Sequence, residues 1–173
     1  MSVVNIHERR FPVSVDKVSA LVDALATEDD PLWPRGKWHA IRLDRPLSVG
    51  ATGGHGPIRY DVAAYVPGQW VRFTFSRPIG FDGFHEFTVH GDDSQTVLRH
   101  MIALRLHSIG RLSWPLKWRW LHDALLEDLL DRAEENLVGS VESPARYSLY
   151  VRFLRSLPRP KKRPRPAAAP PEH

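Results

Sequence analysis

The strongest constraint on this chain is an alternation of apolar and polar residues that runs through residues 38–107. A period of two is typical of β-strands with one buried face, because successive side chains point to opposite sides of a sheet. Turn sequences at Pro67-Gly68 and at residues 91–94 divide the alternating segments into hairpins. We therefore predict an antiparallel meander with one apolar face. Its inward positions are predicted to be Ile58, Tyr60, Val62, Ala64, Val66, Val71, Phe73, Phe75, His85, Phe87, Val89, Thr96, Leu98, His100, Ile102, Leu104 and Leu106.

After Gly110 the apolar residues take up the period of a helix. Ser113 is a suitable N-cap, Pro115 is compatible with a first turn, and Gly139 is a typical helix stop. These limits predict a helix of about 24 residues, or about 36 Å. Its apolar stripe must be buried, and the apolar face of the meander is the large surface available. The stripe consists of Trp118, Leu121, Leu125, Leu129, Ala133 and Leu137.

Two further elements are predicted before the meander. Residues 3–11 are rich in β-branched residues and favour a strand that ends at Pro12. Ser14 can cap a short helix that follows it. Residues 27–37 contain two prolines and a glycine and are predicted to form a loop, with the indoles of Trp33 and Trp38 as a lid.

The positive charge of the chain is concentrated at its end. Residues 143–173 contain eight Lys/Arg and one acidic residue, for a net charge of +7, so residues 1–142 carry −3 of the total of +4. The body therefore has no basic stripe, and we do not expect specific nucleic-acid binding. We divide the chain into a folded domain (1–142), a short basic amphipathic helix (143–157) and a disordered Pro/Lys/Arg-rich tail (158–173).

Composition excludes several classes of protein. The chain has no cysteine, which excludes disulfide frameworks, cysteine zinc sites and cysteine nucleophiles. No window approaches the apolar length of a membrane span, and the charged residues 1–10 lack the apolar core of a signal peptide. Cytoplasmic residence is the resulting expectation.

The order of strand, helix, long meander and long final helix resembles the SRPBCC or START-like helix-grip superfamily, which includes polyketide cyclases and lipid-transport proteins. The sequence segments that carry the resemblance are residues 54–60, the Pro67-Gly68 hairpin leading into residues 71–73, and residues 121–128. The resemblance covers residues 3 to about 140. It implies an α+β fold in which a curved antiparallel sheet grips the last helix around an apolar cavity. It does not imply one activity, because members include enzymes and ligand binders.

With that fold, the inward residues near the last helix become the predicted ligand-binding wall. We expect binding of a small hydrophobic molecule, such as a lipid or a polyketide-like aromatic, with no cofactor and no metal. The predicted wall residues are Tyr60, Phe73, Phe75, Phe87, Leu98, Ile102, Trp118, Leu121 and Leu125.

His85 and His100 are the candidate polar and catalytic residues of this cavity. Each occurs on an apolar strand face, and the hairpin register places them directly or diagonally opposite each other. An imidazole in an apolar pocket can act as a general acid or base, or can orient a ligand oxygen. The alternative is a structural role in which the two rings bond to each other, to Tyr60 or to water.

Three other motifs receive mainly structural interpretations. Residues 53–57 lead into a strand and favour a tight turn over a phosphate loop, with His55 as a weak candidate at the cavity mouth. His122-Asp123 lacks the partner spacing of a zinc site. The acidic positions Asp123, Glu127, Asp131 and Glu135 recur every four residues, which favours a solvated helix face, or a docking surface for the basic tail.

Three functions remain open from the sequence. The first is the ligand binder described above. The second is a cyclase, aromatase or dehydratase that uses His85 or His100 as its base. The third is an interaction module in which residues 143–165 contact an anionic membrane or bind nucleic acid non-specifically.

Overall fold

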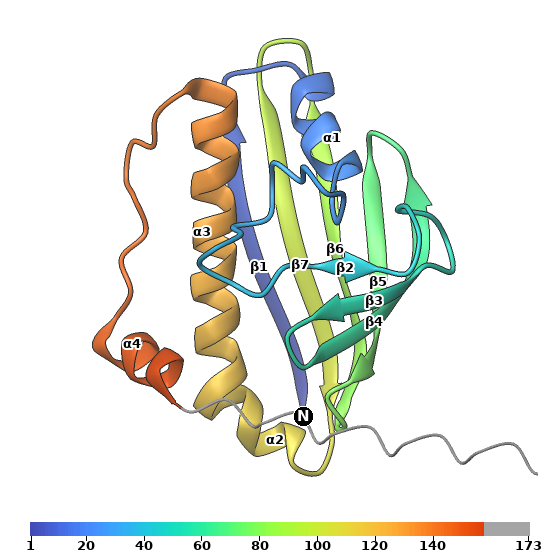
Figure 1. Ribbon diagram of the computed structural model, residues 1–173, viewed down its shortest axis with the longest axis vertical. Helices are drawn as coiled ribbons and strands as arrows, with labels where there is room; N and C mark the ends of the chain where they lie inside the picture. Colours follow the sequence, from blue (N-terminus) through green and yellow to red (C-terminus); the bar gives the residue numbers. More distant parts are fainter. Residues whose placement is uncertain (158–173) are drawn as a thin grey trace, which may run out of the picture.

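The computed structural model describes residues 1–157 and has the α+β architecture expected from the sequence (Figure 1). Within this part of the chain, seven antiparallel strands form one curved, unclosed sheet in the order β1-β7-β6-β5-β4-β3-β2. Residues 158–173, for which a disordered tail was predicted, lie outside the described residues. The strands are β1 (Ser2–Phe11), β2 (Arg42–Leu43), β3 (Thr52–His55), β4 (Ile58–Val66), β5 (Trp70–Arg77), β6 (Phe81–Gly91) and β7 (Thr96–Leu106).

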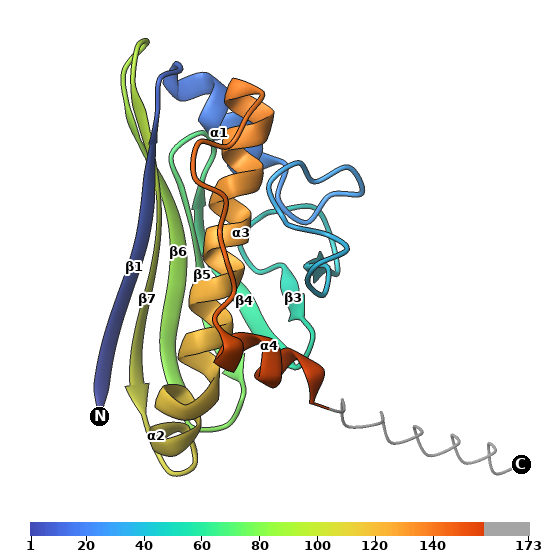
Figure 2. The ribbon, with the colours of Figure 1, turned by 90° about the vertical axis from the view of Figure 1, so that its left-hand side faces the viewer.

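The helical segments lie on one side of this sheet, with α4 packed on α3, as the edge-on view shows (Figure 2). The long α3 runs along the strands, α1 lies near one end of the sheet, and α2 lies at the other end. Among residues 1–157, no helix has both the length and the apolar character needed to cross a membrane. The helical segments are α1 (Val15–Asp23), α2 (Gly110–Ser113), a π-helical turn η1 (Trp114–Trp118), α3 (Arg119–Val138) and α4 (Leu149–Ser156).

Both predicted hairpins are present. Strands β4 and β5 flank Pro67-Gly68, and β6 and β7 flank the turn that follows Gly91. Along β7 every predicted inward position is buried and the intervening side chains are more exposed. The alternation therefore predicted the buried face of this strand correctly.

Strand β4 departs from the predicted alternation at its end. Its pairing with β5 shifts between Val62 and Ala64, where a bulge adds a residue on one strand. Beyond the bulge the side chains exchange faces, so Tyr65 packs against the core and Val66 is 37% exposed. The expectation that Ala64 and Val66 face inward was therefore wrong.

The final helix begins earlier than predicted and is not uniform. Helical structure starts at Gly110, continues through η1, and reaches Val138, with Gly139 in the left-handed conformation at φ 84°. Leu125, Leu129 and Ala133 of the predicted stripe are buried against the sheet. Within η1, the wider π-helical turn brings both Trp114 and Trp118 toward the sheet.

Candidate functional site

A cavity of about 160 Å³ lies between the sheet, the segment from η1 to α3, and the loop before β2. Its walls are almost entirely apolar or aromatic, with imidazole rings as the main polar groups. The side chains predicted from the sequence to form this wall, and found there, are Phe75, Phe87, Ile102, Trp118, Leu121 and Leu125, together with His85 and His100.

Three predicted wall residues do not line the cavity. Tyr60, Phe73 and Leu98 face the expected side of the sheet, but each is no more than 1% exposed and belongs to the core. Phe73 lies beneath His85, with ring centroids 4.8 Å apart and nearly parallel planes. Inward orientation is therefore not sufficient for a wall position, because the neighbouring side chains cover these residues.

Trp33 and Trp38, the predicted lid, also line the cavity, and several other wall residues were not predicted from the sequence. The loop before β2 contributes Trp33, Trp38 and His39, and the β3–β4 turn contributes residues 55–58. Phe81, Trp114, His122 and Leu126 complete the wall. His55 had been named only as a weak candidate, and His122 only as part of a rejected metal motif. The available signal for His122 was its position next to Leu121 and one helical turn before Leu125 and Leu126.

His85 and His100 form a direct pair at the cavity wall. Nδ1 of His85 lies 3.2 Å from Nε2 of His100, within hydrogen-bond distance. In the strand register His85 is opposite Ile102 and His100 is opposite Phe87, so the two histidines are diagonal neighbours, as predicted. The remaining nitrogens, Nε2 of His85 and Nδ1 of His100, have no partner among the described residues.

This pair has a property that does not depend on which tautomer is present. A neutral imidazole has one N–H donor and one acceptor nitrogen. The ring that donates in the bridge has an acceptor as its other nitrogen, and the ring that accepts in the bridge has a donor left over. The pair therefore always offers its surroundings one hydrogen-bond donor and one acceptor.

The pair belongs to a longer row of aromatic rings beneath the cavity. Ring centroids are 5.9 Å apart for His55 and Tyr60, 4.8 Å for Tyr60 and His85, and 5.1 Å for His100 and His122. Nδ1 of His55, the hydroxyl of Tyr60 and both nitrogens of His122 are buried without a hydrogen-bond partner among the described residues. Several unpaired polar atoms in one row of rings are unusual, because each costs about 1–3 kcal/mol when buried.

Burial keeps these histidines neutral near pH 7. Loss of hydration lowers the pKa of His55 to about 3, with neighbouring positive groups as a smaller cause. Loss of hydration also lowers the pKa of His85 and of His100 well below the ordinary value, and lowers that of His122. A neutral imidazole retains a lone pair, so each ring can accept a proton or a hydrogen bond.

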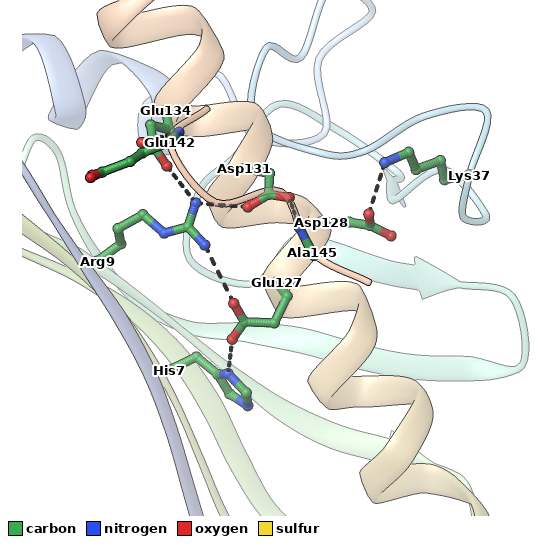
Figure 3. Close-up of polar contacts among 9 residues, drawn as sticks. All are labelled: His7, Arg9, Lys37, Glu127, Asp128, Asp131, Glu134, Glu142 and Ala145. Atoms are coloured by element: carbon green, nitrogen blue, oxygen red, sulfur yellow. Dashed lines mark hydrogen bonds and ion pairs between the residues drawn. The ribbon is translucent and has the colours of Figure 1, made fainter. Parts of the chain in front are cut away.

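The row ends at an ion-pair cluster between β1 and α3 (Figure 3). The ring of His7 lies 5.7 Å from that of His122, Nε2 of His7 is 3.1 Å from Asp123, and Nδ1 is 3.0 Å from Glu127. Burial by itself would lower the pKa of His7, but hydrogen bonds to the two carboxylates outweigh it and raise the pKa to about 9. His7 is therefore an imidazolium ion at neutral pH.

Arg9 continues this cluster along α3. Its guanidinium donates to Asp131 at 2.8 Å, to Glu134 at 2.7 Å and to Glu127 at 3.3 Å (Figure 3). The expectation of a solvated acidic face was therefore wrong for Asp123, Glu127 and Asp131, which pair with β1. Docking of the basic tail stays a prediction, because residues 158–173 lie outside the described residues. Three inward side chains of β1, Asn5, His7 and Arg9, are polar and supply the partners, which the acidic spacing within one helix could not reveal.

A metal site does not account for this cluster as well as ion pairing does. Ligand atoms of His7, His122 and Asp123 lie within 4.8 Å of one another. However, His7 already bonds to two carboxylates through both of its nitrogens, and an imidazolium has no lone pair for a metal. We therefore interpret the group as a structural connection between β1 and α3.

The loop over the cavity is held by a buried carboxylate of α3. Asp128 accepts hydrogen bonds from Nε1 of Trp38 at 2.7 Å and from Nζ of Lys37 at 2.8 Å, and also from the hydroxyl of Tyr147. Arg155 of α4 lies over the Trp38 ring at 4.3 Å and donates to the carbonyl of Lys37. Trp38, one of the two indoles predicted to act as a lid, is thus held in place by α3 and α4 together.

Comparison with known proteins supplies structural neighbours but no sequence relatives. No protein-family model matches the sequence, and no curated protein matches it. Norcoclaurine synthase from Thalictrum flavum, solved with a transition-state analogue, superposes with a TM-score of 0.62 at 12% identity, covering 80% of this chain and 96% of that one.

Two bacterial structures give the same result. A protein from Thermobifida fusca has a TM-score of 0.57 at 13% identity and covers 84% of this chain and 99% of its own. The Aha1 protein from Colwellia psychrerythraea has a TM-score of 0.53 at 17% identity and covers 79% and 98%. With the seven-stranded sheet and the gripped final helix seen in residues 1–157, these neighbours establish that the chain has a helix-grip fold.

Proposed function

We propose that this protein binds a small aromatic molecule that carries a hydroxyl or carbonyl group. The observation that carries this proposal is the aromatic cavity with the His85–His100 pair in its wall. Apolar walls with a few placed polar groups are the usual composition of a small-molecule site. The donor and the acceptor that the pair always presents suit a phenol or an aryl ketone.

The size of the cavity limits the ligand. Its volume of about 160 Å³ is comparable with engineered apolar cavities of about 150 Å³ that bind benzene. A single substituted ring therefore fits with the loop in its present position. Norcoclaurine synthase, which has the same fold, has been solved with dopamine and hydroxybenzaldehyde, so this fold can hold small aromatic molecules. A long-chain lipid would require displacement of the Trp33 and Trp38 loop.

Binding of phenol and of toluene to the wild type and to His100→Phe tests the proposal. The substitution retains an aromatic ring at position 100 and removes both ring nitrogens of His100. We expect phenol to bind about 5–13-fold less tightly to the variant, because one hydrogen bond contributes about 1–1.5 kcal/mol. Toluene, which has no hydroxyl, should bind both proteins equally. Equal loss for both ligands would mean that the variant disturbs the cavity and that the pair does not anchor a polar group.

A cavity-filling variant provides the second control. Leu121→Trp should abolish binding of both ligands, whereas Val138→Trp on the same helix should not, because Val138 is 47% exposed and does not line the cavity. Titration calorimetry measures affinity in each case. Failure of every small aromatic to bind the wild type would overturn the proposed function.

The same histidine pair supports acid–base chemistry as a second candidate function. One nitrogen can remove a proton from the carbon next to a bound carbonyl while the other donates a proton to its oxygen, which gives the enol and leaves the pair in its other tautomer. The step is balanced, because one proton is taken up and one is released. Deuterium exchange into acetophenone in D₂O tests it by NMR. His100→Gln should abolish the exchange while toluene still binds, and absence of exchange with the wild type would exclude this candidate.

A further inference from the structure

The helical segment that walls the cavity also carries exposed apolar residues on its outer side. Leu112, Leu116 and Trp120 recur every four residues from α2 through η1 into α3, and are 63%, 61% and 40% exposed. On the opposite side of the same segment, Trp114 and Trp118 line the cavity. Surface helices normally place polar residues on their outer side, so this arrangement indicates a contact with something apolar.

Neighbouring elements extend this surface. Ile109, which is 61% exposed, directly precedes α2. On the other side, Tyr150 of α4 meets the Trp120 ring at a centroid distance of 5.5 Å, and its hydroxyl donates to the carbonyl of Leu116. Phe153, one turn further along α4, is 56% exposed. We call this set, Ile109, Leu112, Leu116, Trp120, Tyr150 and Phe153, the α2–α4 face.

The charged residues interspersed among the apolar residues of the α2–α4 face are basic, and the nearby acidic residues Asp123 and Asp82 lie next to Arg119 and His107. Arg111, Lys117 and Arg119 are exposed among its apolar residues. Residues 94–122 contain no acidic residue. Residues 143–157 contain three arginines and no acidic residue, and the sequence from 158 to 165 adds five more Lys/Arg directly after α4.

We propose that the α2–α4 face binds the surface of a bilayer that contains anionic lipids. Such a bilayer surface can bind both the apolar and the basic residues of the face. Aliphatic and aromatic side chains enter the headgroup boundary, and basic side chains pair with the lipid phosphates. A nucleic acid would account for the basic residues but would leave the leucines and Ile109 in water. Within the described residues, the expected membrane contact thus extends from α4 to a larger surface that includes α2 and η1.

This inference does not require the proposed function, but it names the place from which a ligand would reach the cavity. Docking through the α2–α4 face would place the outer side of the cavity wall against the bilayer. An apolar ligand dissolved in the bilayer would then be separated from the cavity by the η1 turn alone. Failure of ligand binding would leave the docking test unaffected, since vesicle binding is measured without ligand.

Sedimentation of the full chain with vesicles tests the proposal. The vesicles are of phosphatidylcholine alone, or of phosphatidylcholine with phosphatidylserine. We expect the wild type to bind only to the anionic vesicles, and we expect added salt to weaken this binding.

Leu112→Glu with Leu116→Glu should reduce binding at least 10-fold, because two carboxylates would have to enter the headgroup boundary. Val49→Glu is the matched control: Val49 is 62% exposed in the loop before β3 and should leave binding unchanged. Lys117→Gln should weaken binding roughly 5-fold.

Insertion can be observed directly because the chain has no cysteine of its own. Leu112→Cys and Val49→Cys each accept one environment-sensitive fluorophore. Anionic vesicles should shift the emission of the label at 112 to the blue and leave that at 49 unchanged.

Three outcomes would overturn the proposal. In the first, the variant Leu112→Glu with Leu116→Glu binds vesicles as tightly as the wild type, whereas replacing the five Lys/Arg of residues 159–165 by glutamine abolishes binding. That result would assign the contact to residues 159–165 alone. Another is equal binding to neutral vesicles. The third is absence of vesicle binding together with a dimer that the double variant dissociates, which would assign the face to a second copy of the chain.

Discussion

The buried histidines are the residues that most distinguish this cavity from a purely apolar one. His55, His85, His100 and His122 are neutral in the folded state because burial lowers each pKa. His7, one ring further along the row, is protonated because two carboxylates face it. His7 therefore differs from the neutral rings in having two carboxylates within hydrogen-bond distance, whereas His122, whose Nδ1 is 3.6 Å from Asp123, stays neutral because its burial outweighs that contact.

The neutral histidines predict a loss of stability in mild acid. In the unfolded chain a histidine titrates near pH 6.5, whereas His100 stays neutral in the folded protein well below that pH. Below pH 6.5 the unfolded state binds the additional proton, so the free energy of unfolding falls as pH falls. Each such histidine contributes a slope of up to about 1.4 kcal/mol per pH unit.

His100→Gln should reduce the slope of the free energy of unfolding against pH by the contribution of one histidine. Urea denaturation between pH 6 and pH 5 measures this slope. Phe87→Leu, which changes a ring next to His100 without removing a titratable group, should lower stability but keep the slope. An unchanged slope in His100→Gln would contradict the assignment of a neutral buried ring.

His7 predicts a pH dependence of opposite sign. Its folded pKa of about 9 lies above the unfolded value of 6.5, so its stabilising effect is complete below pH 6.5 and is lost as pH rises to about 9. We expect a loss of about 1–2 kcal/mol over this window, since Asp123 and Glu127 are partly exposed to water. His7→Gln should remove the dependence. Asn5→Ala, which also removes a contact with Asp123, should retain it.

At the scale of elements, the loop before β2 depends on contacts from distant helices. Trp33 and Trp38 belong to a segment with little regular structure, yet Trp33 is 4% exposed. Asp30 accepts from the backbone amides of Ala26, Leu32 and Trp33, which fixes the first half of the loop. Asp128 fixes the second half from α3. The loop therefore closes the cavity through two carboxylates.

Asp128→Ala predicts an opened loop and a less stable protein. The substitution leaves the Trp38 indole and the Tyr147 hydroxyl without their acceptor, at a cost of about 2–4 kcal/mol. Amide hydrogen exchange should increase in residues 33–40. Asp61→Ala, at an exposed position of β4, is the matched control and should change neither quantity. Slow exchange in the variant would show that other contacts hold the loop.

At the scale of the whole molecule, the first strand and the final long helix are joined by charge as well as by packing. Arg9 of β1 contacts three carboxylates of α3, more than 115 residues away in the chain. These side chains cover the edge of the sheet beside the cavity and hold α3 against β1 (Figure 3). The helix is thus gripped by ion pairs at this edge and by apolar contacts elsewhere.

Arg9→Met tests this connection. Removing the guanidinium leaves Asp131 and Glu134, which are mostly buried, next to each other and to Glu127 without their shared cation. We expect the free energy of unfolding to fall by about 2–4 kcal/mol. Arg10→Met changes the neighbouring exposed arginine, whose side chain among the described residues donates a hydrogen bond to Gln95, and should cost less than about 0.5 kcal/mol. Equal effects of the two substitutions would contradict a role for the cluster.

The sequence by itself determined the elements and the faces of most strands. Alternation, turn residues and the helical stripe are local, so they predicted both hairpins, the inward face of β7 and the meeting of His85 with His100. Only the tertiary structure decided the bulge near Val62, the π-helical turn, the cover over Tyr60 and the partners of the acidic residues of α3. These features arise where segments far apart in the chain meet. Local periodicity predicts which face a side chain is on, but not which distant residue covers it or pairs with it.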